Sequence, residues 1–366
     1  MATDPNRRHA AVIGAGIGGL AAAIALRQAG WEATVYEAAP EVRPLGAGLS
    51  IWPNGVRALR QLGLGDLAAA APRADGALRR ADGSVLAEFD PDALEARFEA
   101  PLVGFHRADL HEGLVAALGS ERVRTGMRLE ELETRELRFE DGSSVRADLV
   151  VGADGLGSTV REALLGDGEP RDSGIVAFRG VADLDAPVPA GEWWGAGSVA
   201  GLLPLGGGRV YWYLAHRGDP DRTTLPGLQA EYGEPVREAF SRTAADQVLV
   251  HRLYDRDPVP SWSRGSATLL GDAAHPMLPF LGQGAGSALG DAAALGAAVA
   301  AEPDVEAALT AYERARLERT AALVAGSRKA AKAALLESGL GRRLRNALVA
   351  KAPESIRLRQ LDPFVG

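Results

Sequence analysis

The chain has 366 residues, a formal net charge of −8, no cysteine and six histidines. Its length allows one large domain or two modest ones with a substantial core, and its acidic balance argues against nucleic acid as the main partner. The absence of cysteine excludes disulfides, thiolate nucleophiles and iron–sulfur clusters, and the scattered histidines predict no metal site, so redox chemistry would require a bound cofactor.

The first predicted elements are a strand over residues 10–13, a helix over 20–29 and a strand over 31–37. The glycine pattern after the first strand distinguishes this segment from a signal peptide. The chain contains no continuous apolar stretch of the length, about 18 residues, that suits a membrane span. We therefore expect a βαβ unit in a cytoplasmic protein without a membrane partner.

The βαβ unit carries the sequence GAGIGG directly after its first strand. Gly14 suits a tight turn, Gly16 the close approach of a pyrophosphate, and Gly19 the close packing of helix on strand. Glu37 ends the second strand, where an acid binds the ribose hydroxyls of an adenosine. The pattern predicts a dinucleotide site without separating NAD from FAD. The alternative is a glycine-rich turn that binds nothing.

Two arginines follow at positions where they could meet a cofactor. Arg43 precedes two spaced glycines, and it either holds the adenosine end of the cofactor or lies exposed before a turn. After a hairpin predicted over residues 76–90, with its turn at Asp82-Gly83, Arg107 stands at the start of a helix. Its charge opposes the helix dipole there unless an anion lies nearby.

A second strand, turn and helix recur near the middle of the chain. A hairpin is predicted over residues 136–147 and a buried strand over 148–152, which leads to Asp154-Gly155 and a helix start. An acid at such a strand end points into the crevice where open α/β sheets bind ligands. The alternative is that Asp154 caps the following helix.

Residues 174–214 alternate apolar, aromatic and polar side chains, which predicts an antiparallel sheet. The alternation places Tyr211 and Tyr213 on one face and Trp212 on the other. Arg179 lies in an apolar strand, an unfavourable place for a charge unless it is paired or meets a ligand. This face either roofs a pocket for a planar substrate, including an anionic one, or belongs to an ordinary amphipathic sheet.

The segment LLGDAAHPMLPFLGQGAG, residues 269–286, combines two binding features. Asp272 follows a strand, and its carboxylate can accept hydrogen bonds from sugar or ribityl hydroxyls. The glycine-dense run from Gly282 to Gly286 opens an alanine-rich helix, whose free N–H groups and dipole stabilise an anion. The combination suits a cofactor with a sugar-alcohol middle and a ring that becomes anionic on reduction, as flavin does.

The remaining helices are predicted mostly over 225–244, then over 287–301 and 304–337, with a short tail from Val349. Four basic residues near this end are expected to form a solvated face rather than a membrane anchor. They are Arg342, Arg343, Arg345 and Lys351.

The three motifs stand in an order that is similar, over nearly the whole chain, to that of the single-component FAD-dependent aromatic hydroxylases, the salicylate and p-hydroxybenzoate hydroxylase group. The stretch SIWPNGVRAL also resembles urate hydroxylase-like enzymes. The resemblance implies an FAD-dependent monooxygenase that consumes NADH or NADPH and O2. It implies hydroxylation of an aromatic or heteroaromatic small molecule through a flavin C4a-hydroperoxide.

The resemblance also implies roles for particular residues. The cofactor-binding set is Gly14, Gly16, Gly19, Glu37, Arg43, Ala47, Arg107, Asp154, Asp272, Gly282, Gly284, Ala285 and Gly286. The substrate candidates are Arg179, Tyr211 and Tyr213. Pro279 would lie near the reactive face of the ring, and no side chain is assigned as catalytic because the flavin performs the chemistry.

Two positions depart from the family pattern. Gly286 stands where the family often has Asn, and Gly290 where a Glu is common, which puts side-chain hydrogen bonds to the flavin in doubt. Residues 198–203 also lack the charge that a urate-like anion would need, so urate is not adopted as substrate. The alternatives are an FAD-dependent reductase, a halogenase, although its WxWxIP signature is absent, or a non-catalytic dinucleotide-fold binding protein.

The expected fold is α/β, with a Rossmann-like FAD domain interleaved with an antiparallel substrate sheet and followed by C-terminal helices. We expect the FAD domain over residues 1–72, 106–172 and 262–302. The substrate domain would take 73–105 and 173–261, and the helical segment 303–366. The protein would act as a monomer or homodimer.

Overall fold

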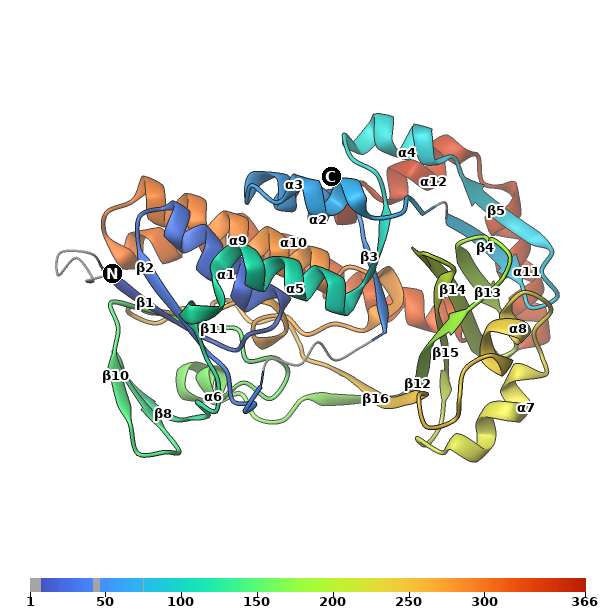
Figure 1. Ribbon diagram of the computed structural model, residues 1–366. Coiled ribbons are helices and arrows are strands. Elements are labelled where there is room, and N and C mark those ends of the chain that lie inside the picture. The colour runs from blue at the N-terminus through green and yellow to red at the C-terminus, as the bar shows by residue number, and fades with distance from the viewer. Residues whose placement is uncertain (1–7, 42–46, 75) are drawn as a thin grey trace.

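The computed structural model describes residues 8–41, 47–74 and 76–366, so the predicted Arg43 lies outside the described residues. Two main sheets stand at opposite ends of the molecule, and long helices run between them (Figure 1). The predicted α/β class is confirmed.

One sheet is parallel throughout. Its strands, in spatial order, are β17 (Ala267–Leu269), β11 (Leu149–Gly152), β1 (His9–Ile13), β2 (Glu32–Tyr36) and β7 (Val123–Arg124). The central strands read as continuous apolar runs because both faces of the sheet are covered. The strands predicted here from the sequence are confirmed to within two residues.

Closely packed helices surround this sheet. They are α1 (Ile17–Gln28), α2 (Pro53–Gln61), α5 (Arg107–Leu118), α6 (Thr159–Leu165), α9 (Gly284–Ala301) and α10 (Val305–Ala334). Helices α1 and α6 contact its strands, α5 and α9 pack on α1, and α2 and α10 pack on α9. Glycine allows the contacts: a Cβ on Gly18 would lie 2.7 Å from Leu270 Cδ2, and one on Gly296 would lie 2.7 Å from Ala25 Cβ. Of the described helices, α9 alone is long and apolar enough to span a membrane, and 56% of it is buried. Packing against α1 and α10 explains its composition.

The other main sheet has seven strands. In spatial order they are β16 (Leu249–Asp255), β12 (Arg171–Asp183), β15 (Arg209–Arg217), β14 (Ser198–Gly206), β13 (Gly191–Trp194), β4 (Gly76–Arg80) and β5 (Val85–Phe89). One face buries Trp212 and Phe178 beneath α7 (Leu225–Gln229) and α8 (Val236–Ser241). The helix predicted over most of 225–244 is therefore divided into two short helices. Gly233 and Pro235 interrupt it because both disfavour a helix interior.

Smaller elements complete the layers. The hairpin strands β8 (Leu129–Glu133), β9 (Glu136–Phe139) and β10 (Ser144–Arg146) form one small sheet, and β3 (Gly48–Ile51) pairs with β6 (Val103–His106). Two short helices, α3 (Gly65–Ala70) and α4 (Pro91–Phe98), lie near them in sequence. Both predicted hairpins, over residues 76–90 and 136–147, are confirmed by the antiparallel pairs β4–β5 and β9–β10.

The expected tail from Val349 is wrong. The chain ends in α11 (Gly339–Lys351), α12 (Glu354–Gln360) and α13 (Asp362–Val365). Leu358 and Val365 are buried in a cluster with Phe98, so apolar contacts far apart in sequence stabilise helices that are individually short.

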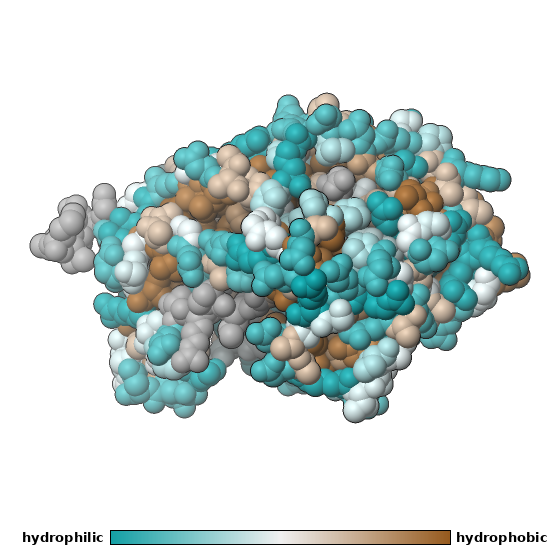
Figure 2. Space-filling view, turned by 45° about the vertical axis from the view of Figure 1, so that its right-hand side comes forward, coloured by the Kyte–Doolittle hydropathy of each residue, from teal (hydrophilic) through white to brown (hydrophobic). Residues whose placement is uncertain are grey.

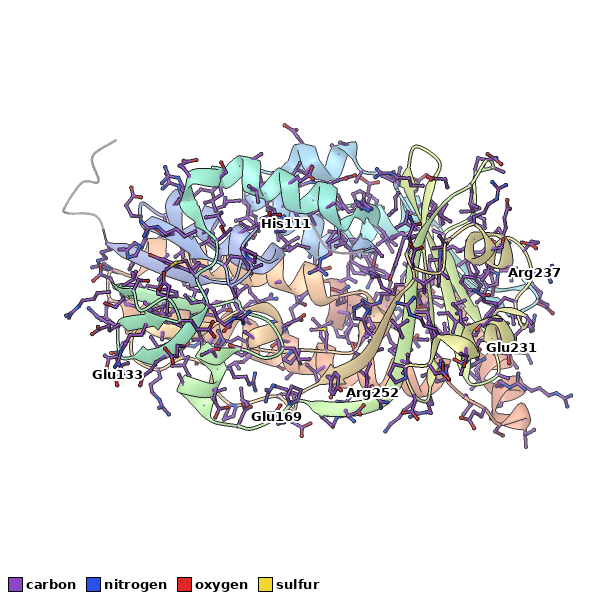
Figure 3. The ribbon with its side chains drawn as sticks, turned by 60° about the horizontal axis from the view of Figure 1, so that its bottom comes forward. His111, Glu133, Glu169, Glu231, Arg237 and Arg252 are labelled. Atoms are coloured by element: carbon purple, nitrogen blue, oxygen red, sulfur yellow. The ribbon has the colours of Figure 1, made fainter. Side chains whose placement is uncertain are left out.

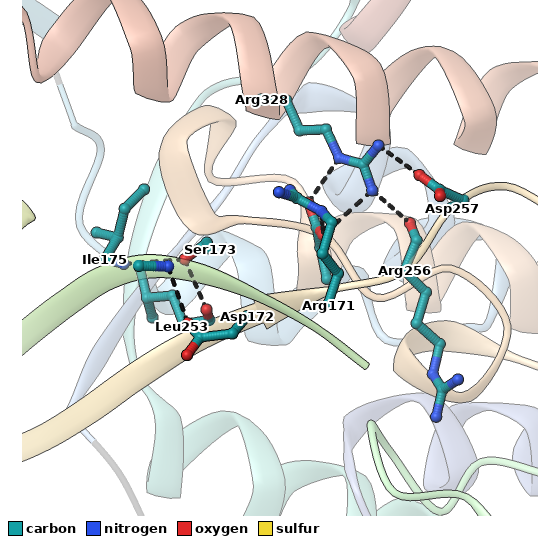
Figure 4. A network of polar contacts seen from close by, with 10 residues as sticks. Arg171, Asp172, Ser173, Ile175, Leu253, Arg256, Asp257 and Arg328 are labelled. Carbon is teal, nitrogen blue, oxygen red and sulfur yellow. Dashed lines mark hydrogen bonds and ion pairs between the residues drawn. The ribbon is translucent and has the colours of Figure 1, made fainter. Parts of the chain in front are cut away.

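A buried carboxylate ties the seven-stranded sheet to α10 (Figure 4). Asp255 is fully buried and accepts two hydrogen bonds of 2.7 Å from Arg171 on β12, and bonds of 2.7 and 3.1 Å from Arg328 on α10. Burial opposes ionisation, but these hydrogen bonds outweigh it and hold the pKa of Asp255 below its usual value. Arg328 also bonds the exposed Asp257.

Replacing Asp255 by Asn should lower the free energy of unfolding by about 2 kcal/mol. Breaking a fully buried ion pair costs about 3–5 kcal/mol, and the loss expected here is smaller because both arginines reach solvent. Asp257→Asn is the matched control and should cost less than about 1 kcal/mol. Urea unfolding at neutral pH measures both, and equal effects would contradict the anchoring role of Asp255.

Candidate functional site

A cleft of about 290 Å³ opens at the carboxyl ends of β1, β2 and β11. Its walls include three predicted residues from separate turns, Gly16, Glu37 and Asp154. Met127 and Arg128, which belong to no motif, line it as well. The cleft therefore lies where open α/β sheets bind dinucleotides.

The three glycines of GAGIGG have different surroundings. Gly14 has φ +101°, and a Cβ there would lie 2.5 Å from the Ala153 carbonyl oxygen. A Cβ on Gly19 would overlap the Gly14 carbonyl, so helix and turn pack directly. Gly16 faces open space, with no atom within 4 Å of a Cβ position. This arrangement leaves room at the start of α1 for a phosphate.

Glu37 is held in place by backbone donors. Its carboxylate accepts a hydrogen bond of 2.7 Å from the Ala15 N–H and one of 2.9 Å from the Ala39 N–H. Each oxygen keeps a further lone pair for a ligand hydroxyl. His111 on α5 is buried, and its Nε2 lies 2.7 Å from the Ala15 carbonyl oxygen (Figure 3).

Asp154 lies at the opposite wall of the cleft. It accepts a hydrogen bond from the Ser158 hydroxyl and one of 3.3 Å from the Val160 N–H, so it also supports the start of α6. Burial raises the pKa of Asp154. From the same helix, Arg161 is buried and donates to the carbonyls of Ala273 and Ala274 at 2.9 and 2.8 Å. Arg161 thereby holds the turn that carries Asp272, a link that the sequence did not reveal.

Asp272 follows β17, in the turn held by Arg161. The residue is exposed to solvent and accepts no hydrogen bond from any residue the structure describes. The surrounding protein nevertheless desolvates its carboxylate and raises its pKa, although the charges of His275 and Arg107 act in the opposite direction. Arg107, at the start of α5, likewise has no side-chain partner in the described part of the chain, and its N–H donates to the carbonyl of the predicted Ala47 at 3.1 Å. Both side chains are thus available to a ligand.

A buried network fixes the Asp272 turn. Asp291 on α9 accepts hydrogen bonds from the Gly271 N–H at 3.0 Å and from Arg316 at 2.7 Å, and pairs with His275 Nε2 at 2.6 Å. Burial opposes ionisation, but His275 and Arg316 hold the pKa of Asp291 far below its usual value. The Arg316 guanidinium lies 3.2 Å from a Cβ position on Gly290, so a larger side chain at this position would crowd it.

The start of α9 presents unpaired N–H groups. Gly284, Ala285 and Gly286 form its first turn, where N–H groups have no intrahelical acceptor. Gly284 faces open space, whereas a Cβ on Gly282 would lie 2.7 Å from Ser50 Oγ. Asn54 from α2 lies 3.5 Å from a Cβ position on Gly286, and its Oδ1 is buried without a partner among the described residues. Asn54 thus brings an amide close to the helix start that lacks the family's Asn.

The seven-stranded sheet presents a polar row on the face away from α7 and α8. Cross-strand pairing aligns Arg179, Tyr213, Gly201 and Glu192 on four neighbouring strands. The Tyr213 ring occupies the space above Gly201, and its hydroxyl donates to Glu192 at 2.5 Å. Trp194 Nε1 also donates to Glu192, at 3.1 Å. Glu192 and Trp194 were not predicted, because their strand contains no recognisable motif.

Of the two charged residues in the polar row, Glu192 has hydrogen-bond partners and Arg179 has none among the described residues. Burial raises the pKa of Glu192, although its hydrogen bonds from Tyr213 and Trp194 lower it. Burial raises the pKa of Tyr213, and the nearby Glu192 raises it further, so the proton stays on the tyrosine. Arg179 is half-buried and has neither hydrogen bond nor ion pair with any described residue. Tyr211 lies beside it, with its ring centre 5.9 Å from that of Tyr213. Arg179 therefore offers its charge to an anion.

The polar row and the cofactor turns are neighbours. A Cβ on Gly48, the first residue of β3, would overlap Tyr211, while Ser50 of the same strand borders Gly282. Leu278 and Phe280, which flank the exposed Pro279, pack against the sheet. The structure thus brings the two groups of predicted residues together, with β3 and the Pro279 loop between them.

These surroundings fit FAD. The open Gly16 turn has room for a pyrophosphate, the carboxylate of Asp272 has no partner among the described residues and is free for hydroxyl groups, and the start of α9 has free N–H groups for an anionic ring. Near the start of α9 and the Asp272 turn, the buried Oδ1 of Asn54 and Nδ1 of His275 are both without hydrogen-bond partners among the described residues.

Comparisons with known proteins agree. Residues 7–327 match the family described as FAD binding domain. The chain is 35% identical over 332 residues to an aurachin C monooxygenase/isomerase from Stigmatella aurantiaca, covering 86% of this chain and 87% of the relative. It is 35% identical over 345 residues to an FAD-dependent urate hydroxylase from Klebsiella pneumoniae, covering 87% and 88%. The structure of Klebsiella pneumoniae HpxO complexed with FAD and uric acid superposes with a TM-score of 0.91 at 30% identity, covering 98% of this chain and 96% of that one.

Two aspartates near the cleft should respond differently to replacement. Asp272→Asn should weaken FAD binding by about 10–100-fold, through loss of a charged acceptor. The unfolding temperature of the FAD-free protein should not fall, because folding disfavours the Asp272 charge. Flavin fluorescence titration and thermal unfolding measure the two effects.

Asp291→Asn should lower both quantities, with a loss of about 3 kcal/mol in stability, because His275 and Arg316 lose a buried anion. Since its folded pKa lies below the unfolded value, the contribution of Asp291 is present at neutral pH and disappears as the pH falls below about 4. Parallel loss of stability in both variants would contradict the assignment of Asp272 as a ligand-facing group.

Proposed function

The chain belongs to the FAD binding domain family of FAD-dependent monooxygenases, and on that premise we propose that it uses NAD(P)H and O2 to hydroxylate an anionic aromatic or heteroaromatic small molecule. When bound, FAD supplies the redox chemistry: it accepts hydride from the nicotinamide and activates O2 for transfer of a hydroxyl group. The N–H groups at the start of α9 stabilise negative charge on the ring. One observation carries the substrate proposal: the unpaired charge of Arg179 beside the cofactor turns.

Arg179 lies at one end of the proposed substrate site, and the Tyr213–Glu192 pair lies at the other. A carboxylate or phenolate at one end would pair with Arg179 through charge-assisted hydrogen bonds. Toward Glu192, the Tyr213 hydroxyl oxygen and the free lone pairs of the carboxylate accept hydrogen bonds from an amino, hydroxyl or ring N–H group. The flat Tyr213 ring provides an aromatic floor between them.

Urate is not proposed as the substrate, although a relative carries its name. Residues 198–203 on β14 bring no charged side chain to the polar row. The Tyr213 ring also fills the space over Gly201, so that no side chain from this position could reach a ligand without displacing it. The site therefore recognises its anion from β12.

The direct experiment uses FAD-loaded protein with NADH or NADPH and a panel of aromatic carboxylates, phenols and heteroaromatics. Consumption of the nicotinamide should rise with the true substrate, and mass spectrometry should find a product heavier by one oxygen atom. A protein that retains FAD but yields no oxygenated product across the panel would favour a reductase, and one that cannot be loaded with FAD a binding protein.

Arg179→Gln should raise the KM for a carboxylate substrate by about 10–100-fold, because one charged hydrogen-bond pair is lost. The KM for the corresponding neutral amide should change little. Tyr211→Phe is the matched control, since it removes a hydroxyl from the same face and leaves the cation in place. If Arg179→Gln affects the carboxylate and the amide equally, the charge of Arg179 does not select the substrate.

A further inference from the structure

The helix α11 turns its apolar side chains to solvent. Leu340, Leu344 and Leu348 are 80%, 61% and 65% exposed, and no residue of α11 is buried. Because they are spaced four residues apart, they form one line along the helix, here named the leucine stripe. A surface helix ordinarily directs such a stripe at the core. In α11 the arrangement is inverted.

Polar contacts fix this inverted orientation. On the side facing the protein, Arg345 donates to the carbonyls of Ala333 and Ala334 at 2.7 and 3.1 Å. Its guanidinium carbon lies 4.4 Å from the ring centre of Trp194. The leucine stripe cannot turn inward without breaking these contacts. It therefore remains available to a partner.

The partner must be anionic. Between Lys329 and Gln360 the chain carries eight Lys and Arg residues and two Glu residues, although the whole protein has a net charge of −8. Arg343 and Lys351 are exposed beside the leucine stripe, and α11 contains no acidic residue. A second copy of the same helix would bring like charges together across the contact.

The area is also small for a protein partner. The 13 residues of α11 span about 20 Å, and a strip about 10 Å wide offers about 200 Å². A stable protein interface buries about 800 Å² on each side. A lipid surface needs no complementary shape, and it accepts a short amphipathic helix flanked by Lys and Arg.

We propose that α11 docks this protein on an anionic membrane surface, with the leucine stripe among the acyl chains and Arg343 and Lys351 at the lipid phosphates. The molecule remains peripheral, because only one short helix at its end is involved (Figure 1). The surface at this end is otherwise largely hydrophilic, with apolar atoms in small patches (Figure 2). The sequence favoured a solvated face because it could not show which way the leucines point.

Docking would also place the polar row near the bilayer. Arg345 of α11 lies over the ring of Trp194, and Trp194 donates a hydrogen bond to Glu192. A single side chain, that of Trp194, therefore connects α11 to the proposed substrate site. An aromatic anion with an apolar part held in the membrane would then reach the site from the lipid side. This consequence rests on the proposed function, whereas the docking itself does not.

Flotation of the FAD-loaded protein with lipid vesicles tests the proposal. The protein should float with vesicles of phosphatidylcholine mixed with phosphatidylglycerol, should float much less with phosphatidylcholine alone, and should be released by high salt. Leu344→Ser combined with Leu348→Ser should reduce binding at least about tenfold. Tyr254→Ser, at an exposed aromatic residue on β16, is the matched control and should bind as the parent does.

A charge reversal separates electrostatic from apolar contributions. Arg343→Glu should weaken vesicle binding about tenfold, whereas Arg146→Glu, the same change on the exposed strand β10, should not. Retained flavin absorbance and an unchanged unfolding temperature will show that each variant is folded. The proposal is overturned if the parent protein does not float with anionic vesicles. It is also overturned if the leucine variants instead dissolve a dimer seen by light scattering, because the stripe is then a contact between two copies.

Discussion

The buried carboxylate of Asp291 is the contact on which the proposed cofactor site depends. It joins the backbone of Gly271, the ring of His275 and the guanidinium of Arg316, and so ties a strand end, a loop and two helices to one point. An anion without these three donors would be too costly to bury. Because they satisfy it, the neighbouring Asp272 can remain without a hydrogen-bond partner among the described residues and stay exposed. One acid is used for structure, and its neighbour is left for binding.

The proposed site also depends on glycines that let neighbouring helices and strands approach each other closely. Gly18 and Gly296 let α9 lie directly on α1 and on the end of β17. Gly48 lets β3 touch Tyr211 of the seven-stranded sheet. These contacts bring the starts of α1 and α9, and the polar row, to one region. The alanine-rich composition of α9 is thus a packing requirement rather than a sign of membrane insertion.

The sequence predicted elements with strong local signals and missed contacts between distant segments. GAGIGG, the two Asp-Gly hairpins and the Gly-rich start of α9 are specified by turn chemistry, so they could be read locally. Arg161 and Glu192 could not, since an arginine in a helix or a glutamate in a short strand acquires its role only from what lies across the fold. The C-terminal helical segment was predicted, but the short helices α12 and α13 were taken for a tail, because Leu358 and Val365 stabilise them through contacts with residues more than 250 positions earlier, such as Phe98.

The ring of Tyr213 lying over Gly201 links two positions that are 12 residues apart in sequence. Neither can change alone: a side chain at 201 displaces the ring, and a small residue at 213 leaves a hollow in the floor and removes a donor from Glu192. If this face binds the substrate as proposed, larger changes in its shape at these positions would require paired substitutions. Relatives that differ in substrate should show these two positions covarying.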